Sequence, residues 1–297
     1  MRPQPRPSSN FAPTQPNGPV RPGFSPIFFD ANGNPSPIES SYHGCHAFLL
    51  LNGPSAAKAP LEALKGCYVM TVNNGPSIFR SSANVMVDPA NRFSMSQWLD
   101  PMIQKFVPQT HHNSPLFDNR KLGKGQKWEW TKKRVSQCPN VIYFRRKDTF
   151  NAETFVRERS ICWGSALGGE KNVRSVMFAA LRILVALGFK EIYLIGADFA
   201  MNAKNRYAFK MEPNEASAKG NARSYALLNE AFTKLQPELV KAGINVWNCT
   251  HESKLTAFPK MNVAKAIATA KAEIGDWNTE KLVGMYDDES KRNLLKK

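Results

Sequence analysis

Short polar side chains follow several apolar runs of this sequence, at the points where each run gives way to a turn. They are Asn52, Gly53, Pro54 and Ser55 after the first run, Asn73 and Asn74 after the second, and then Asp88, Asp198 and Thr250. Amides, hydroxyls and carboxylates can hydrogen-bond the base, ribose and phosphates of a nucleotide. Parallel strands bring their carboxyl ends to one edge of a sheet, so we expect these side chains to line a nucleotide-binding crevice there.

The first of these turns, residues 52–55, has features of a ligand-binding loop. Gly53 lets the backbone approach a ligand closely, and Ser55 is suited to cap a following helix. The turn lacks the Gly-Lys-Ser/Thr ending of a Walker A loop and is not a GxGxxG motif, so we do not expect a dinucleotide cofactor. A plain turn with a helix cap is the alternative interpretation.

Two side chains are candidates for a catalytic base. Asp198 follows an apolar run, and His251 lies in a turn after another. An imidazole with a pKa near about 6.5 can deprotonate an acceptor hydroxyl or bind a phosphate. The alternative for His251 is a solvated loop residue, which is also the simplest interpretation of His111 and His112 in their polar loop.

The cysteines and histidines do not predict a metal site. His43, Cys45 and His46 form a compact cluster, but no second pair of ligands with zinc-site spacing follows it. The five cysteines are scattered and odd in number, which is typical of reduced thiols in a cytoplasmic protein.

The charge balance favours a polyanionic partner. The 297 residues carry 40 Lys+Arg against 24 Asp+Glu, a net charge of +16, and 42% of them are hydrophobic. The excess of positive charge predicts contact with nucleic acid or with an anionic membrane surface, and a solubility charge is the alternative. No apolar run reaches the roughly 18 residues of a membrane-spanning helix, and the N-terminus lacks the apolar segment of a signal peptide.

The segment 105–147 concentrates this charge. It holds eleven Lys/Arg against Asp118 and Glu129, with aromatic residues interleaved. Its cations could neutralise a row of phosphates while a tryptophan stacks on a base. The candidates are Lys121, Lys124, Lys127, Trp128, Trp130, Lys132, Lys133 and Arg134. A solvated basic excursion, with its aromatic side chains packed on the domain, is the alternative.

Alternating strand and helix patterns predict an α/β fold with a doubly wound, mostly parallel sheet. We expect strands at 47–51, 67–73, 84–87, 140–144, 191–195 and 245–248, and helices at 94–106, 174–187, 225–242, 261–274 and 279–296. Prolines recur every third residue from Pro13 to Pro22, which indicates a flexible arm over 1–43. Residues 44–275 then form the Rossmann-like domain with the basic insertion 105–147, and 276–297 a helical tail.

Two stretches resemble known families. The stretch from Ala186 to Phe199, followed by Tyr207-Ala208-Phe209, resembles the centre of the bacterial family 42 sialyltransferases. The stretch Asn248-Cys249-Thr250-His251-Glu252-Ser253-Lys254-Leu255, with Phe258-Pro259 after it, resembles the MptE-like family. That family includes 6-hydroxymethylpterin pyrophosphokinases and proteins of bacteria and phages. The resemblance implies a GT-A-like, Rossmann-type fold that holds a nucleotide.

The resemblance also implies roles for single residues. Tyr207 matches a tyrosine that contacts the leaving phosphate, Asn73 falls where the transferases place a nucleotide-contacting asparagine, and Ser253 lies in the MptE-like stretch. Other positions depart from the pattern. Ala200 stands where a first tyrosine is expected, and residues 216–224 contain no histidine where the transferases carry their catalytic base. These departures indicate a donor other than a sialic acid nucleotide.

Together these features predict a nucleotide-sugar-dependent glycosyltransferase. Asp198 or His251 would be the base, and Arg174 or the basic insertion would neutralise phosphate in place of a metal. The acceptor would be DNA, through a hydroxylated pyrimidine, or another polyanion, with an anionic membrane surface as the alternative. In a phage protein, the location would be the host cytoplasm.

Two other functions remain open. One is an MptE-like diphosphotransferase that uses ATP and Mg²⁺, with Asp88 or Asp198 as a ligand. The other is a non-catalytic nucleic-acid-binding or virion-associated protein on a transferase scaffold.

Overall fold

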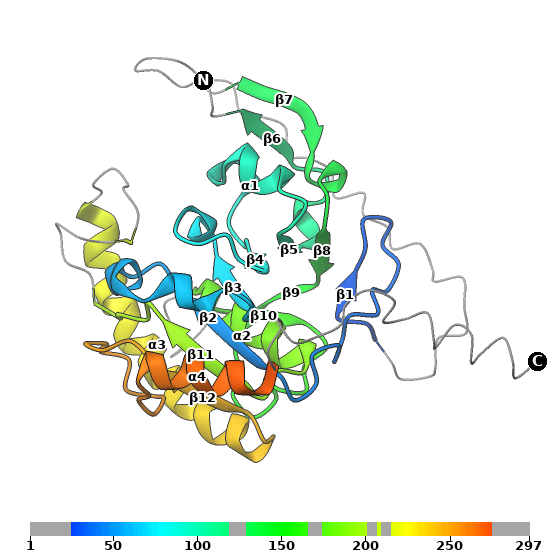
Figure 1. Cartoon of the computed structure of the whole chain (residues 1–297). Helices are drawn as coiled ribbons and strands as arrows, with labels where there is room; N and C mark the ends of the chain where they lie inside the picture. The colour runs from blue at the N-terminus through cyan, green and yellow to red at the C-terminus, as the bar shows by residue number, and fades with distance from the viewer. Residues whose placement is uncertain (1–24, 119–128, 166–173, 201–206, 209–214, 275–297) are drawn as a thin grey trace, which may run out of the picture.

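One eight-stranded sheet forms the centre of the molecule (Figure 1). The computed structural model describes residues 25–118, 129–165, 174–200, 207–208 and 215–274. The strands of the central sheet are β1 (Phe28–Phe29), β2 (His46–Leu50), β3 (Val69–Val72), β4 (Ala83–Val85), β5 (Gln104–Pro108), β8 (Val141–Phe144), β11 (Glu191–Ile195) and β12 (Asn245–Asn248). Their order is β1-β8-β5-β4-β3-β2-β11-β12, and all neighbours are parallel except β1 and β8. The predicted α/β class with a mostly parallel sheet is confirmed.

Two small sheets, four α-helices and several short 3-10 helices accompany the central sheet in the described part of the chain. Strand β6 (Pro115–Asp118) pairs antiparallel with β7 (Glu129–Arg134), and β9 (Arg146–Thr149) pairs parallel with β10 (Ile161–Ser165). The helices are α1 (Met95–Leu99), α2 (Val176–Leu187), α3 (Glu215–Lys241) and α4 (Val263–Ile274).

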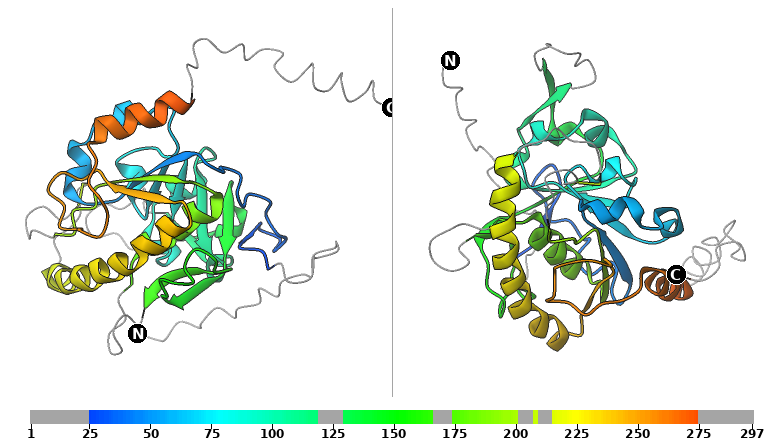
Figure 2. Two further views of the ribbon diagram at one scale, coloured as in Figure 1. Left: turned by 90° about the horizontal axis from the view of Figure 1, so that it is seen from below. Right: turned by 90° about the vertical axis from the view of Figure 1, so that its left-hand side faces the viewer.

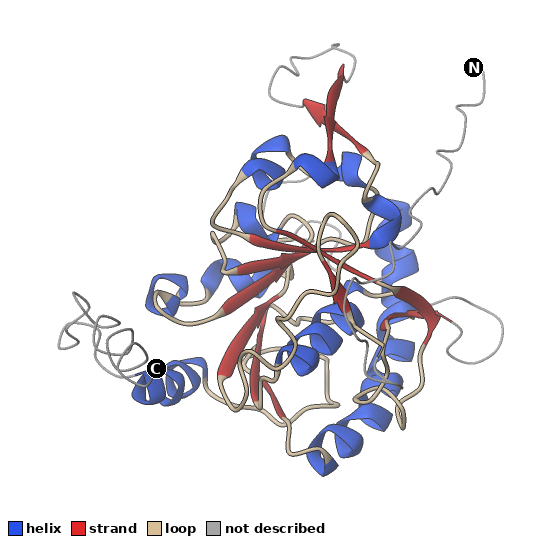
Figure 3. Ribbon diagram, turned by 90° about the vertical axis from the view of Figure 1, so that its right-hand side faces the viewer, coloured by secondary structure: helices blue, strands red, loops and turns tan. Residues whose placement is uncertain are grey.

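Helices lie on both faces of the central sheet (Figures 2 and 3). Along β2, Ala47 and Leu49 belong to the cluster that includes α2 and α3, whereas Phe48 and Leu50 pack with residues of α4. Helix α1 packs on the second face as well, towards β5 and β8. A strand covered on both faces has no polar side, which is why β2 is a continuous apolar run.

Helix α2 is buried along nearly its whole length. The Ser175 hydroxyl accepts the backbone N–H of Met177 at 3.2 Å and caps the N-terminus, and Gly188 ends the helix with a φ of +98°. Arg182 lies inside this apolar helix, where its guanidinium donates to the backbone oxygen of Glu158. Burial lowers the pKa of Arg182 to about 10. Because α2 leads into the start of β11, its own N-terminus lies at the carboxyl edge of the sheet.

The predicted helix over 94–106 is wrong in its second half. Helix α1 ends at Leu99, and the chain enters β5 at Gln104. Pro101 explains the difference, because proline lacks the N–H of a helix interior and disfavours helical geometry in the residue before it. The other strands and helices expected between residues 47 and 274 form at or near their predicted positions, except that α3 begins at residue 215, ten residues before the helix expected at 225–242. The helix expected at 279–296 lies outside the described residues.

The N-terminal segment packs on the sheet from residue 25 onwards, earlier than the predicted boundary at residue 43. Ile27, Phe28 and Phe29 are buried, and β1 pairs with β8. Arg159 holds this segment by donating to the Ser25 backbone oxygen at 2.6 Å and to both carboxylate oxygens of Glu39. Residues 25–43 of the arm expected over 1–43 are therefore part of the folded domain. The rest of that arm, residues 1–24, and the tail expected over 276–297 lie outside the described residues.

His111 is buried, with 8% of its surface exposed, although its polar loop indicates a solvated side chain. Burial, together with the nearby charge of Arg146, lowers the pKa of the imidazole to about 4. Its Nδ1 has no hydrogen-bond partner among the described residues. The histidine is therefore neutral at physiological pH.

Replacing Phe28 with alanine should lower the free energy of unfolding by about 3–5 kcal/mol. The ring is 1% exposed and lies 5.5 Å from the ring of Phe106, so the substitution leaves a cavity in the core. Urea denaturation measures the loss. Val240→Ala, on the exposed face of α3, serves as the control and should change stability by less than about 0.5 kcal/mol. Equal stabilities of the two variants would show that β1 contributes nothing to the core.

His111 should make folding sensitive to acid. The unfolded chain protonates this imidazole near pH 6.5 and the folded chain near pH 4, so its contribution is present above pH 6.5 and is lost as the pH falls towards 4. Between pH 7 and pH 4, we expect the free energy of unfolding of the wild-type protein to fall by about 3 kcal/mol more than that of His111→Gln. Urea denaturation at both pH values tests this, with His43→Gln as the exposed-histidine control. The prediction fails if all three proteins lose stability equally.

Candidate functional site

A crevice opens at the carboxyl edge of the sheet, between β2 and β11. From β2 the chain proceeds to β3 on one side, whereas from β11 it proceeds to β12 on the other. In open α/β sheets, ligands bind at such a reversal of strand order. Residues after β2, β3 and β11, together with the start of α2, line a cavity of about 180 Å³ here. This is smaller than the roughly 300–1,000 Å³ of sites for drug-sized ligands.

Asp198 joins the loops after β2 and β11. Its Oδ2 accepts the hydroxyl of Ser55 at 2.7 Å, and its Oδ1 accepts the backbone N–H of Ser55 at 3.3 Å. Gly53 makes this approach possible, because a Cβ there would lie 2.0 Å from Asp198 Oδ2 and 2.4 Å from the Gly196 oxygen. Pro54 begins a short 3-10 helix, whose start has no side-chain cap. Ser55 therefore binds Asp198 and does not cap the helix as predicted.

Asn52 and Asn73 line the crevice and are held by the neighbouring strands. Asn52 Nδ2 donates to the backbone oxygen of Val72 at 3.1 Å, and the backbone oxygen of Asn73 accepts Asn84 Nδ2 at 2.9 Å. The side-chain oxygens of both crevice asparagines are buried and have no hydrogen-bond partner within the described chain. A buried acceptor without a partner costs about 1–3 kcal/mol, so a ligand that donates to these oxygens gains affinity.

Two non-glycine residues of the crevice have left-handed backbone conformations. Asn73 has a φ of +52° and Phe199 a φ of +51°. Asparagine adopts this region readily, but an aromatic residue there is strained. Phe199 is held by ring contacts with Tyr225 and Phe232, at centroid distances of 5.1 and 6.1 Å. Strain of this kind is concentrated at binding and catalytic sites.

Two tyrosines line the crevice, and the sequence analysis identified only one of them. Tyr207 lies there as predicted, beside Tyr225 of α3. Burial, with smaller contributions from Tyr207 and Asp198, raises the pKa of Tyr225 to about 12. Its phenol is therefore protonated and available as a donor at neutral pH. In the sequence, Tyr225 is indistinguishable from a core residue of an amphipathic helix.

The N-terminus of α2 also faces the crevice, through Ser175 and the first residues of the helix. The N–H groups and dipole at the start of a helix attract anions. Arg174 is exposed just before this point, with its guanidinium carbon 5.4 Å from the centre of the Trp163 ring, and Arg146 stacks on the same ring at 4.5 Å. Arg174 itself does not line the cavity.

Several predicted nucleotide-binding residues lie elsewhere. Pro54, Ser55, Asn74, Asp88, Thr250 and Ser253 do not line the crevice. Asp88 lies 3.7 Å from Nη1 of Arg92. The exposed His251 is likewise not part of its lining.

Thr250 and Ser253 have a structural role, because both bind the backbone of Ala197. Thr250 Oγ1 accepts the N–H of Ala197 at 2.9 Å, and Ser253 Oγ donates to the Ala197 oxygen. The backbone N–H of Lys254 donates to the backbone oxygen of Asp198 at 2.9 Å and completes the attachment. The loop after β12 therefore holds the loop that carries Asp198.

The predicted nucleic-acid-binding residues are only partly described. Lys132, Lys133 and Arg134 are exposed on β7, and Arg134 Nη1 donates to the Asn113 oxygen at 2.8 Å. The β6–β7 hairpin projects from the body of the molecule beyond α1 (Figures 1 and 3). Trp130 lies opposite Phe117 in this hairpin, and its side chain is not described. Four other candidates lie outside the described residues: Lys121, Lys124, Lys127 and Trp128.

Neither a cluster of metal ligands nor a membrane-spanning helix is present among the described residues. No three of their His, Cys, Asp or Glu side chains are grouped as metal ligands would be. None of the helices they form has the length and apolar character needed to cross a membrane.

Comparisons with known proteins give no relatives. No protein-family model, curated protein or solved structure matches this chain. The crevice must therefore be interpreted from its own residues.

Replacing Ser55 with alanine should lower the free energy of unfolding by about 1–2 kcal/mol, because the Asp198 carboxylate loses its hydroxyl donor in a partly buried position. Ser77→Ala removes a hydroxyl from an exposed position and is the matched control. Urea denaturation of both variants measures the difference. A loss no larger in Ser55→Ala than in Ser77→Ala would mean that this contact does not hold the two loops together.

Proposed function

We propose that the crevice binds a nucleotide and that the chain is a nucleotide-sugar-dependent glycosyltransferase with a GT-A-like fold. The proposal rests on two amide oxygens, those of Asn52 and Asn73, at the reversal of strand order. Neither oxygen has a hydrogen-bond partner among the described residues. Hydroxyl and amino groups of a ribose and base are the donors that these oxygens lack. The resemblance of residues 186–209 to sialyltransferases supports a reaction in which the bound nucleotide donates a sugar.

The parts of the crevice suit the parts of a nucleotide sugar. The N-terminus of α2 and the Tyr207 hydroxyl would bind the diphosphate or monophosphate that leaves. Asp198 would accept the proton of the acceptor hydroxyl, whose oxygen forms a bond to the anomeric carbon as the bond from that carbon to the phosphate oxygen breaks. We assign the base to Asp198 because it lines the crevice and His251 does not.

Positive charge beside α2 and on the β6–β7 hairpin would serve the phosphates and the acceptor. Arg174 and Arg146, both stacked on Trp163, lie next to the start of α2, and Lys132 and Lys133 are exposed on the projecting hairpin. These groups favour a polyanionic acceptor, and we propose DNA that carries a hydroxylated pyrimidine. Such a base must leave the duplex, or be single-stranded, to reach a crevice.

The geometry favours this function over an ATP-dependent diphosphotransferase. That reaction would use Asp88 or Asp198 to hold Mg²⁺. Asp88 lies outside the crevice lining, which leaves Asp198 as the one carboxylate in the described lining that could hold the ion.

Nucleotide binding is tested by thermal shift with a panel of nucleotides and nucleotide sugars. At least one should raise the melting temperature, and Asn73→Gly should weaken its binding by about 1–3 kcal/mol. Glycine removes the amide and keeps the left-handed backbone free of strain. Ser40→Gly is the matched control, because Ser40 also has a left-handed backbone, with a φ of +60°, and is an exposed residue outside the crevice lining. If no nucleotide shifts the melting temperature, the enzymatic proposal fails and the non-catalytic scaffold is favoured.

Transfer is then measured with the best donor, labelled in the sugar. Label should move to DNA that contains hydroxymethylated pyrimidines, and Asp198→Asn should reduce the rate about a hundredfold or more. Anionic vesicles with a hydroxylated lipid are the second acceptor, at the same ionic strength. Label in lipid alone would reject DNA as acceptor, and release of AMP from ATP would favour the diphosphotransferase.

A further inference from the structure

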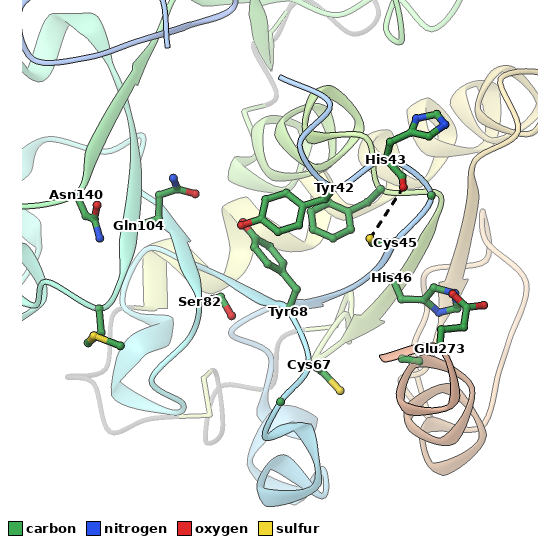
Figure 4. Close-up of a pocket in the computed structure, with 15 residues that line it drawn as sticks. Tyr42, His43, Cys45, His46, Cys67, Tyr68, Ser82, Gln104, Asn140 and Glu273 are labelled. Atoms are coloured by element: carbon green, nitrogen blue, oxygen red, sulfur yellow. Dashed lines mark hydrogen bonds and ion pairs between the residues drawn. The ribbon is translucent and has the colours of Figure 1, made fainter. Parts of the chain in front are cut away.

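A second cavity lies at the opposite edge of the sheet from the crevice (Figure 4). Its volume is about 780 Å³, within the roughly 300–1,000 Å³ of known small-molecule sites. Residues at or before the starts of β2, β3, β4, β5, β8 and β11 line it, together with the last turns of α4. Nothing in the proposed transfer reaction uses this site.

Three aromatic rings form one wall of this cavity. Tyr42 stacks on Phe189 with a centroid distance of 4.9 Å and an interplanar angle of 14°. Tyr68 contacts both rings, at 4.8 Å from Tyr42 and 4.6 Å from Phe189. A wall of mutually supported rings presents a rigid surface to a flat aromatic ligand.

Polar groups lie on either side of the aromatic wall. Figure 4 shows Gln104 and Asn140 to one side of Tyr42 and Tyr68, and His46 and Glu273 to the other. Asn140 Nδ2 donates to the backbone oxygen of Pro101 at 2.7 Å, which orients the amide. Side-chain amides can pair with the donor and acceptor edge of a heterocycle.

Glu273 is held in place while it remains accessible. Its Oε2 lies 2.7 Å from Nε2 of His46, and Nδ1 of that histidine lies 3.0 Å from the Tyr193 hydroxyl. The Glu273 side chain is 58% exposed. An oriented, accessible carboxylate is the group that proteins use to bind the hydroxyls of a ribose.

The Tyr68 hydroxyl is a buried polar group on the cavity wall that lacks a partner among the described residues. Burial also raises the pKa of this phenol, so it remains a donor. A buried donor without a partner is unfavourable, and a ligand acceptor that displaces the neighbouring side chains slightly would satisfy it.

The charge of the lining restricts the ligand. Among the described residues, none that lines the cavity is a lysine or an arginine, although the chain has a net charge of +16. The only carboxylate in the described lining is that of Glu273. Phosphorylated ligands are therefore disfavoured, and an uncharged molecule is favoured.

We propose that this cavity binds an uncharged nucleoside. The proposal rests on the aromatic wall, the flanking amides, the oriented carboxylate and the lack of lysine and arginine in the described lining. The base stacks on the aromatic wall with its polar edge towards Gln104 and Asn140, and the ribose hydroxyls donate to Glu273. This site is separate from the crevice, so nucleoside binding here does not depend on the proposed transfer reaction.

Isothermal titration of the full chain with adenosine, guanosine, cytidine and uridine tests the proposal. At least one nucleoside should bind at a single saturable site, and its 5′-monophosphate should bind there at least about tenfold more weakly. Glu273→Gln should weaken nucleoside binding about tenfold, because a charged acceptor is replaced by a neutral one. Glu230→Gln is the matched control, since the Glu230 carboxylate also lies 2.7 Å from a side-chain nitrogen, Nζ of Lys234, but on the surface of α3.

The outcomes separate the two sites. Nucleoside binding that Glu273→Gln weakens and Asn73→Gly leaves unchanged supports the cavity, whatever happens to transfer activity. Binding that only Asn73→Gly weakens assigns the nucleoside to the crevice and overturns the proposal. The proposal is also overturned if none of the four nucleosides binds at millimolar concentration.

Discussion

The parallel pairing of β2 with β11 is the constraint on which the crevice depends. The two strands run in register from His46 opposite Glu191 to Leu50 opposite Ile195. Beyond them, the N–H of Leu51 donates to the Ile195 oxygen at 2.8 Å and that of Gly53 to the Gly196 oxygen at 3.1 Å. The loops thus leave the sheet side by side, too close for any side chain at residue 53. Beyond this point, the hydrogen bonds from Ser55 to Asp198 keep the two loops together beside the crevice.

The order of the strands decides which polar residues reach that space. Asp88 and Asn52 both follow apolar strands, yet β4 lies two strands away from β2, about 10 Å at ordinary strand spacing. Thr250 and Ser253 follow the edge strand β12 and bind the backbone of the neighbouring loop. Strand order is a property of the whole fold, so the residues at single strand ends could not reveal which of them face a ligand and which support the others.

Local patterns predicted the elements well where one physical rule dominates. The buried strands and α2 are apolar runs of the right length in the sequence. Helix α2 also begins after a serine and ends at a glycine, and both residues are visible in the sequence. The two-residue β1 leaves no such pattern, because its stability comes from pairing with β8 and from the burial of Phe28. His111 and Tyr225 show the same limit at the level of side chains. Both side chains are covered by segments that are distant in the sequence. The residues next to them in the sequence therefore do not predict their burial.

The position of β1 has a consequence for how copies of the chain meet. Phe28 and Phe29 pair with Phe144 and Tyr143, so this short strand covers the side of β8 that would otherwise be the open edge of the sheet. An uncovered edge strand offers unpaired N–H and C=O groups to another molecule and promotes aggregation. The guanidinium of Arg145, 5.0 Å from the centre of the Phe29 ring, adds a charge beside this boundary. The few residues around β1 therefore protect the edge of β8 from pairing with another molecule, and cleavage after them would expose that edge.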